Sequence, residues 1–218
     1  MTRRDADDGV FILASASPRR HELMRGLGVP FEVVVSDAPE PVRETNEACE
    51  QYAVRMALGK ARAVAAQHPG RWVLGADTIV VIDDMVLGKP SDAEDARQML
   101  RSLSGRAHEV HTGVALVRSG GGDSRAEHTA VATTQVRFRD LTDDEIDRYV
   151  ATDEPLDKAG AYGIQGQGGA LVSGYSGSHT NVVGLPVELV AEMLSTHTLM
   201  PVKQESLDGL RAAGHRFT

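Results

Sequence analysis

Signals for β-strands and α-helices alternate along the first two thirds of the chain, and this alternation constrains the fold more than any other feature. Such an order is typical of α/β proteins, in which helices cover a sheet. We expect strands at residues 10–13, 31–35, 72–82, 85–87, 110–117 and 130–138. We expect helices at residues 18–27, 48–67, 91–103, 142–151 and 186–195, with capping boxes that begin at Ser91 and Thr142. The sequence therefore predicts an α/β fold.

No internal repeat or linker divides the sequence, so we expect one domain, residues 10–198, with room for two lobes. Residues 1–9 form a charged N-terminal extension ahead of this domain. Residues 199–218 form a C-terminal tail without a clear hydrophobic period, and we expect this tail to be peripheral.

Charge and composition limit the class of partner. The 218 residues carry 23 basic and 31 acidic side chains, a net charge of −8, which argues against a nucleic-acid-binding protein. No apolar run approaches the about 20 residues that span a membrane, and the charged residues 1–8 do not resemble a signal peptide. The single cysteine, Cys49, excludes an internal disulfide and fits a reducing compartment. We therefore expect a cytoplasmic protein.

The segment from Ser15 to Arg20 joins the first strand to the first helix. Ser17 is a favourable N-cap residue, and Pro18 suits the first helical position because no N–H is needed there. Arg19 and Arg20 add positive charge to a helix end that is already partly positive, which is favourable if an anion binds there. The segment predicts a phosphate site; the alternative is an ordinary capped helix with two solvated arginines.

Two charged residues lie where the pattern calls for apolar ones. Lys60 falls on the apolar stripe of the helix at 48–67, so its ammonium must either meet an anion or extend outward to water. Asp77 lies in the middle of the apolar strand at 72–82, where carboxylates are rare. Asp77 is either a general base or metal ligand, or an edge residue that accepts backbone hydrogen bonds.

Two further segments carry candidate binding residues. Lys89 follows a predicted hairpin and is either a phosphate-binding cation or an ordinary turn lysine. Residues 157–166 combine Lys158 and Gln165 with glycines that let the backbone approach a ligand closely. The amide of Gln165 offers a donor and an acceptor, which suits a base with one N–H flanked by carbonyls. The alternative for this segment is a plain glycine-rich loop.

Six motifs, in the same order, resemble the Maf family of nucleoside triphosphate pyrophosphatases over residues 10–195. They are Ser15-Ala16-Ser17-Pro18-Arg19-Arg20, Gly75-Ala76-Asp77-Thr78, Gly88-Lys89-Pro90, Leu103-Ser104-Gly105, Asp157-Lys158-Ala159-Gly160 and Asn181-Val182-Val183-Gly184-Leu185-Pro186. The resemblance implies a Maf/ITPase-like α/β fold, an elongated mixed β-sheet flanked by helices with a cleft between two lobes. The segment 161–166 is similar to the branch that hydrolyses dTTP and UTP to the monophosphate and pyrophosphate.

The resemblance also implies roles for individual residues. Asp77 matches the family's proton acceptor, and Glu40 aligns with an acidic position that helps Asp77 to hold a divalent metal cofactor, Mg²⁺ or Mn²⁺. The positions associated with substrate choice are Arg19, Thr78 and Gln165. The residues expected to bind phosphate are Ser15, Ser17, Arg20, Lys60, Lys89 and Lys158. The expected partners are a nucleoside triphosphate and, because the family often forms homodimers, a second copy of the chain, but no nucleic acid and no membrane.

Other functions fit the same residues. The same chemistry on modified pyrimidine nucleotides would clear non-standard nucleotides, and the same chemistry on 7-methyl-GTP would serve a different base. A nucleotide-binding regulator of cell division, acting at the septum, would use binding rather than hydrolysis. The basic residues together with Asp77 favour the enzyme, because a sensor needs no buried base.

Overall fold

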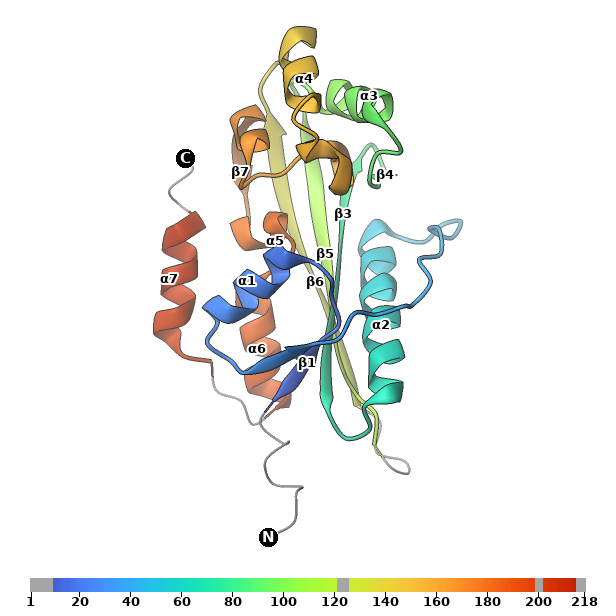
Figure 1. Ribbon diagram of the computed structural model, residues 1–218, viewed down its shortest axis with the longest axis vertical. Helices are drawn as coiled ribbons and strands as arrows, with labels where there is room; N and C mark the ends of the chain where they lie inside the picture. Colours follow the sequence, from blue (N-terminus) through green and yellow to red (C-terminus); the bar gives the residue numbers. More distant parts are fainter. Residues whose placement is uncertain (1–9, 121–125, 199–201, 215–218) are drawn as a thin grey trace.

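A seven-stranded mixed β-sheet forms the centre of the computed structural model, which describes residues 10–120, 126–198 and 202–214 (Figure 1). The strands are β1 (Phe11–Leu13), β2 (Phe31–Val33), β3 (Trp72–Ile82), β4 (Met85–Leu87), β5 (Ala107–Arg118), β6 (Ala126–Phe138) and β7 (Val172–Ser176). Their order is β2-β1-β3-β5-β6-β7, and β4 pairs with β3. β1 is parallel to β2 and β3, whereas the other pairs are antiparallel. The prediction of a mixed α/β fold is confirmed.

Helices flank this sheet on both faces (Figure 1). They are α1 (Pro18–Gly26), α2 (Cys49–Gln67), α3 (Ala93–Leu103), α4 (Asp143–Val150), α5 (His179–Val183), α6 (Val187–His197) and α7 (Gln204–Gly214). Three short 3₁₀ helices, η1 (Glu154–Asp157), η2 (Ala159–Ala161) and η3 (Gln167–Leu171), lie between α4 and β7 along the chain. α2 packs on one face, and the larger core, which includes α1 and α6, packs on the other. Within the described residues, no helix has the length and hydrophobicity needed to cross a bilayer.

Two strand glycines bring α2 into direct contact with the sheet. A side chain at Gly75 would lie closer than 3.0 Å to the backbone of Ala57, and one at Gly113 would clash with the backbone of Ala53. Since alternate residues of a strand share a face, Asp77 points to the same side as Gly75, toward α2. This close packing places Asp77 on β3 opposite the middle of α2.

The structure corrects several of the expected boundaries. β2 ends at Val33 rather than residue 35, while β5 and β6 begin three and four residues earlier than expected, at Ala107 and Ala126. The hairpin formed by β3 and β4 is as predicted. At α3 the N-cap is Asp92, whose side chain accepts from the amides of residues 94 and 95, so the box expected at Ser91 is wrong. The capping box at Thr142 is confirmed.

Three elements escaped the sequence pattern. β7 contains Gly174 and has no alternation of apolar residues, and α5 is too short to show a helical period. The third is α7, residues 204–214 of the tail that shows no clear hydrophobic period, and it packs against the main hydrophobic core through Leu207 and Leu210. The N-terminal extension, residues 1–9, lies outside the described residues, as do residues 199–201 and 215–218.

Candidate functional site

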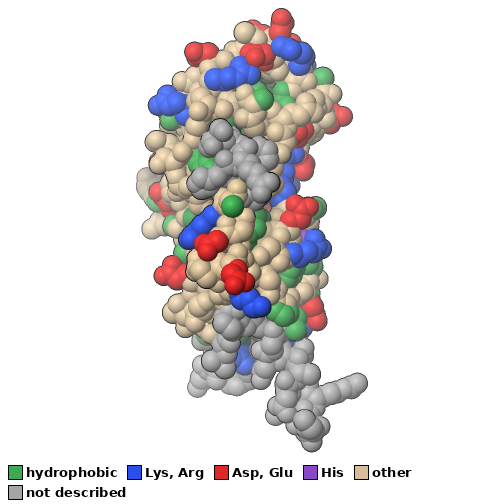
Figure 2. Space-filling view, turned by 90° about the vertical axis from the view of Figure 1, so that its left-hand side faces the viewer, with side chains coloured by type: hydrophobic (Ala, Val, Ile, Leu, Met, Phe, Trp, Pro, Cys, Tyr) green, Lys and Arg blue, Asp and Glu red, His purple; other side chains and the backbone are tan. Residues whose placement is uncertain are grey.

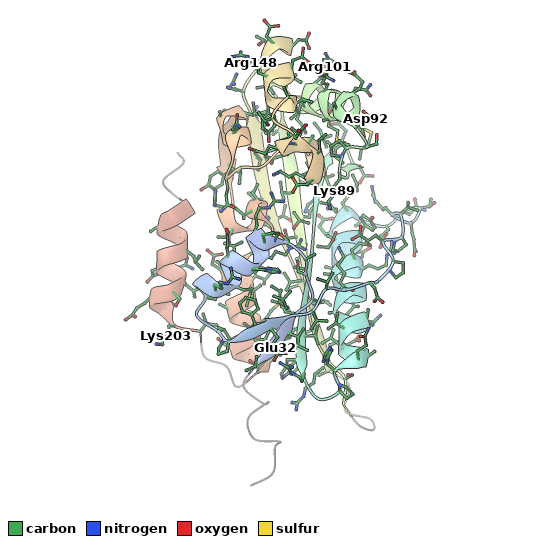
Figure 3. The ribbon with its side chains drawn as sticks, viewed as in Figure 1. Glu32, Lys89, Asp92, Arg101, Arg148 and Lys203 are labelled. Atoms are coloured by element: carbon green, nitrogen blue, oxygen red, sulfur yellow. The ribbon has the colours of Figure 1, made fainter. Side chains whose placement is uncertain are left out.

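A cleft of about 850 Å³ brings together segments that are far apart in the sequence. Its walls are formed by residues 14–20, 35–36, 40, 52, 56, 60, 77–80, 86–89, 110, 154, 157–159, 162–166 and 182–184. Every residue predicted to bind substrate or metal therefore lines this one cleft. In Figure 3 Lys89, which is exposed, lies between the end that carries α3 and α4 and the end that carries α2.

The N-terminus of α1 opens onto the cleft. The helix begins at Pro18, so the amides of Arg19 and Arg20 have no carbonyl one turn earlier in the helix to bind. Ser17 is the N-cap residue, but its side chain makes no capping bond, which corrects that part of the prediction. The backbone N–H of Ser17 instead donates to Oγ of the buried Ser15 at 3.2 Å. This helix end thus keeps donors and partial positive charge for a ligand.

Arg20 is fixed by three hydrogen bonds. Its Nε donates to the carbonyl of Gly184 at 2.7 Å, Nη2 donates to Oγ1 of Thr78 at 3.0 Å, and Nη1 donates to Oγ of Ser15 at 3.4 Å. Burial lowers the pKa of Arg20, and the nearby carboxylate of Asp77 opposes this shift. Thr78, predicted to affect substrate choice, therefore also orients a cation in the cleft.

Lys60 joins two carboxylates in the cleft. Its Nζ lies 2.5 Å from Oδ1 of Asp77 and 2.7 Å from Oε1 of Glu40. The side chains of Lys60 and Asp77 are only 16% and 15% exposed, so water screens their attraction weakly. Burial works against the ammonium, but the two carboxylates outweigh it and raise the pKa of Lys60. The hydrogen bond from Lys60 lowers the pKa of Glu40. Lys60 thus meets an anion, as one of the two predicted alternatives requires.

Asp77 lies in the middle of β3, past Leu74, the last residue of the strand in register with β1, and before Val80, where the pairing with β4 begins. β3 pairs with β1 on one side and with β5 on the other, and Asp77 itself is in register with Gly113 of β5. Within the described chain, the donor to its carboxylate is the Lys60 ammonium, at Oδ1, rather than a backbone amide. The alternative in which Asp77 merely accepts backbone hydrogen bonds is therefore wrong. Oδ2 remains able to accept a proton from a bound water.

Three cations at the cleft lack a carboxylate partner. Across residues 10–120, 126–198 and 202–214, no ion pair within 4 Å involves Arg19, Arg20 or Lys89. We call residues 15–20 with Lys60, Asp77 and Lys89 the charged wall. Cations that have no carboxylate partner and lie beside a helix N-terminus form a site for a polyanion. By contrast, acidic and basic side chains are interspersed on the face that carries α7 (Figure 2).

The carboxylates of Asp77 and Glu40 supply oxygen ligands of the kind that bind Mg²⁺ in proteins. Both lie within 2.7 Å of the same Lys60 nitrogen, so they converge on one region of the cleft. No cluster of three or more His, Cys, Asp or Glu side chains that could hold a metal occurs within the described part of the chain. This donor set fits an ion held by one or two carboxylates together with the phosphates of its substrate.

Residues 163–168, which we call the glycine loop, form a second wall of the cleft through residues 163–166. Gln165 lies exposed in this loop and lines the cleft. The sequence suggested that the glycines of this loop let the backbone approach a ligand. In the structure they also make room for other parts of the protein. A side chain at Gly166 or Gly168 would lie closer than 3.0 Å to the carboxylate of Glu154 or the hydroxyl of Tyr149, respectively. The close approach there is to the protein's own side chains.

Lys158 supports the same wall. Its Nζ donates to the carbonyl of Glu154 at 2.6 Å and to Oδ1 of Asp157 at 2.5 Å, and its side chain is 12% exposed. A side chain at Gly163 would clash with the Lys158 stem. Lys158 lines the cleft, and its phosphate-binding role stays a prediction.

Sequence reasoning missed Tyr149, Glu154 and Thr112. Thr112 Oγ1 lies 2.9 Å from Oγ1 of Thr78 and donates to the carbonyl of Asn181 at 3.1 Å, so it extends the network that holds Arg20. Only its polarity in an apolar strand could have signalled this role. Nothing in the sequence near Glu154 marks it, because its partners are backbone amides that only the folded loop supplies.

A family model described as "Maf-like protein" matches residues 10–197. A dTTP/UTP pyrophosphatase of Escherichia coli (strain K12) is 51% identical over 198 residues, which cover 90% of this chain and 98% of that protein. A dTTP/UTP pyrophosphatase of Syntrophotalea carbinolica is 52% identical over 193 residues, 88% of this chain and 86% of that protein.

Among solved structures, a HAM1 protein from Coxiella burnetii is similar with a TM-score of 0.47 and 19% identity, over 86% of this chain and 98% of that chain. The family match spans almost the whole of the described domain, and relatives of nearly equal length share half of their residues with it. The chain belongs to the family of Maf-like proteins.

Proposed function

We propose that this protein is a nucleoside triphosphate pyrophosphatase that hydrolyses dTTP and UTP to the monophosphate and pyrophosphate. The observation that carries the proposal is the position of Asp77, a carboxylate held by Lys60 in a cleft with three cations that have no carboxylate partner among the described residues. The names of the relatives, which are about half identical over most of the chain, support the same substrates.

The charged wall would bind the triphosphate. The amides at the start of α1 and the side chains of Arg19, Arg20 and Lys89 would neutralise the phosphate oxygens, which otherwise repel an attacking water. Asp77 would orient this water and take its proton at Oδ2, because Lys60 occupies Oδ1. Proton abstraction and charge neutralisation together account for cleavage between the α and β phosphates.

A divalent cation, Mg²⁺ or Mn²⁺, fits this site. Asp77 and Glu40 would hold it, and when bound it would supply charge for the phosphates and acidify a water. Lys60 lies between these carboxylates and would keep them together before the nucleotide arrives.

The glycine loop would read the base. Uracil and thymine present one N–H between two carbonyls, and the amide of Gln165 can donate to one and accept from the other. Modified pyrimidines that keep this edge would be substrates as well, so the enzyme would also clear non-standard nucleotides. We further propose a cytoplasmic location, in keeping with the single free Cys49, and a homodimeric assembly.

Pyrophosphate release tests the proposal. The purified protein is incubated with Mg²⁺ and, in turn, with UTP, dTTP, CTP, GTP and 7-methyl-GTP, and pyrophosphate is quantified. We expect release from UTP and dTTP to exceed release from the other nucleotides. Faster release from 7-methyl-GTP would move the protein to a different base. Binding of UTP without any pyrophosphate release would instead indicate a regulator that acts by binding.

A further inference from the structure

Two side chains outside the charged wall clamp the glycine loop. The backbone N–H groups of Gln167 and Gly168 donate to the carboxylate of Glu154 at 2.9 and 3.2 Å. The N–H of Gly163 donates to the hydroxyl of Tyr149 at 3.2 Å, and this hydroxyl donates to Oε1 of Glu154 at 2.9 Å. The two ends of the loop are thus tied to one hydrogen-bonded pair, with Gln165 between them.

Glu154 is committed to this task although it lines the cleft. Both carboxylate oxygens accept hydrogen bonds from the loop, and Oε1 also accepts from Tyr149. Burial opposes ionisation of Glu154, yet these bonds outweigh it and hold its pKa below the ordinary value. An ionised carboxylate that already accepts three hydrogen bonds serves poorly as a proton acceptor for water. The position of Glu154 therefore indicates that it holds the glycine loop in place.

The glycine loop packs so closely against Tyr149 and Glu154 that two of its positions accept only glycine. Any side chain at Gly166 or Gly168 would overlap Glu154 or Tyr149. A tight turn adds to the constraint, because the N–H of Gly166 donates to the carbonyl of Gly163 at 3.2 Å. The backbone on both sides of Gln165 is therefore fixed, while the side chain itself is exposed to the cleft.

We propose that Tyr149 and Glu154 are positioning residues that set the preference for uracil and thymine by fixing where the amide of Gln165 meets the base. This inference rests on the proposed function. A glutamine on a mobile backbone could rotate and translate to meet several bases, so it would discriminate poorly. Discrimination requires that donor and acceptor stay in place, since a mismatched base then leaves polar groups unpaired.

The test compares Glu154→Gln and Tyr149→Phe with wild type. The ratio of kcat/KM for UTP to kcat/KM for CTP should fall about tenfold in each variant, through KM for UTP and with kcat little changed. Adding Gln165→Ala to either variant should lower the ratio no further than Gln165→Ala alone, because the pair acts through that amide. Glu145→Gln is the matched control, since it changes a carboxylate on α4 that binds the Thr142 amide and does not line the cleft.

Amide hydrogen exchange measures the stability of the hydrogen bonds to Glu154 independently of enzyme activity. In Glu154→Gln the amides of Gln167 and Gly168 should exchange faster than in wild type, while that of Val114 in β5 should not change. An unchanged base ratio in both variants would overturn the proposal, as would an equal loss for UTP and CTP. Failure of the proposed function would look different: wild type would release no pyrophosphate from any nucleotide, whatever the loop amides did.

Discussion

The two walls of the cleft are built in different ways. The charged wall rests on regular structure, with Arg19 and Arg20 in the first turn of α1, Lys60 in the middle of α2 and Asp77 inside the central strand β3. The glycine loop has no such framework. It follows η2, runs into the first two residues of η3, and is held by side chains that bind its backbone amides. One wall is fixed by the sheet, and the other by a few hydrogen bonds.

This difference suggests a division of labour. The phosphates are common to all nucleoside triphosphates, and a rigid site for them needs no adjustment between substrates. The base differs between substrates, and a loop held by a few contacts can change its preference without loss of the fold. Changes at Arg20 and Asp77 of the charged wall should therefore affect all nucleotides alike, whereas changes in the glycine loop should affect them unequally.

The largest effect is expected from Asp77→Asn. An amide accepts no proton at neutral pH, so turnover of every nucleotide should fall about 10³-fold, the scale of a lost general base. UTP binding, measured by calorimetry, should persist because the cations remain. Asp144→Asn, on the exposed surface of α4, is the control. Turnover near the wild-type value in Asp77→Asn would remove Asp77 from the reaction.

The free energy of unfolding should depend on pH through His108, which contacts Tyr162, the residue just before the glycine loop. His108 is buried, its Nε2 lies 2.8 Å from the Tyr162 hydroxyl, and burial lowers its pKa to about 4. Between pH 6.5 and 4 the unfolded chain binds a proton that the folded chain does not, so stability falls as the pH falls. This histidine should cost about 3 kcal/mol of unfolding free energy at pH 4 relative to pH 7.

His108→Gln, which cannot titrate, checks that prediction. Urea unfolding at pH 7, 5.5 and 4.5 should show the stability of wild type decreasing more steeply than that of the variant. Parallel curves for the two proteins would mean that His108 becomes protonated in the folded state as easily as in the unfolded chain.

Arg20 links the charged wall to other segments of the cleft through its hydrogen bonds. In Arg20→Lys one ammonium replaces a guanidinium that binds Gly184, Thr78 and Ser15 together. We expect kcat/KM to fall about 30-fold for UTP and CTP alike, with no change in their ratio. Arg25→Lys, exposed on the last turn of the same helix, should have no effect. A shift in the base ratio would contradict the division between the walls.

The sequence predicted the charged wall better than the glycine loop, for a physical reason. Lys60 and Asp77 break the apolar periods of a helix and a strand, and such a break is visible because the surrounding pattern is strong. The predicted strand and helix are confirmed as β3 and α2, and Lys60 meets an anion, as one of its two predicted alternatives required; that this anion is Asp77 was not predicted. The β3–β4 hairpin was also predicted from a strong apolar pattern, since two apolar runs flank Asp83-Asp84.

The glycine loop has no period to break. Its shape depends on hydrogen bonds from backbone amides to Glu154 and Tyr149, and the residue types alone do not indicate these partners. The same limit applies to α7, whose few apolar residues become a packing face only because the core lies beside them. Glycines suggested a ligand, whereas much of the space they provide is filled by the protein itself.

The smallest effect, and the sharpest comparison of the two walls, is expected from Gln165→Ala. Removing one amide that faces the base should lower kcat/KM for UTP about tenfold, the value of one or two hydrogen bonds, and leave that for CTP nearly unchanged. Gln167→Ala is the matched control, because Gln167 is exposed and does not line the cleft. Steady-state kinetics with UTP and CTP give both values. An equal loss for the two nucleotides would mean that the loop only closes the cleft, and that the base is read by residues of the charged wall.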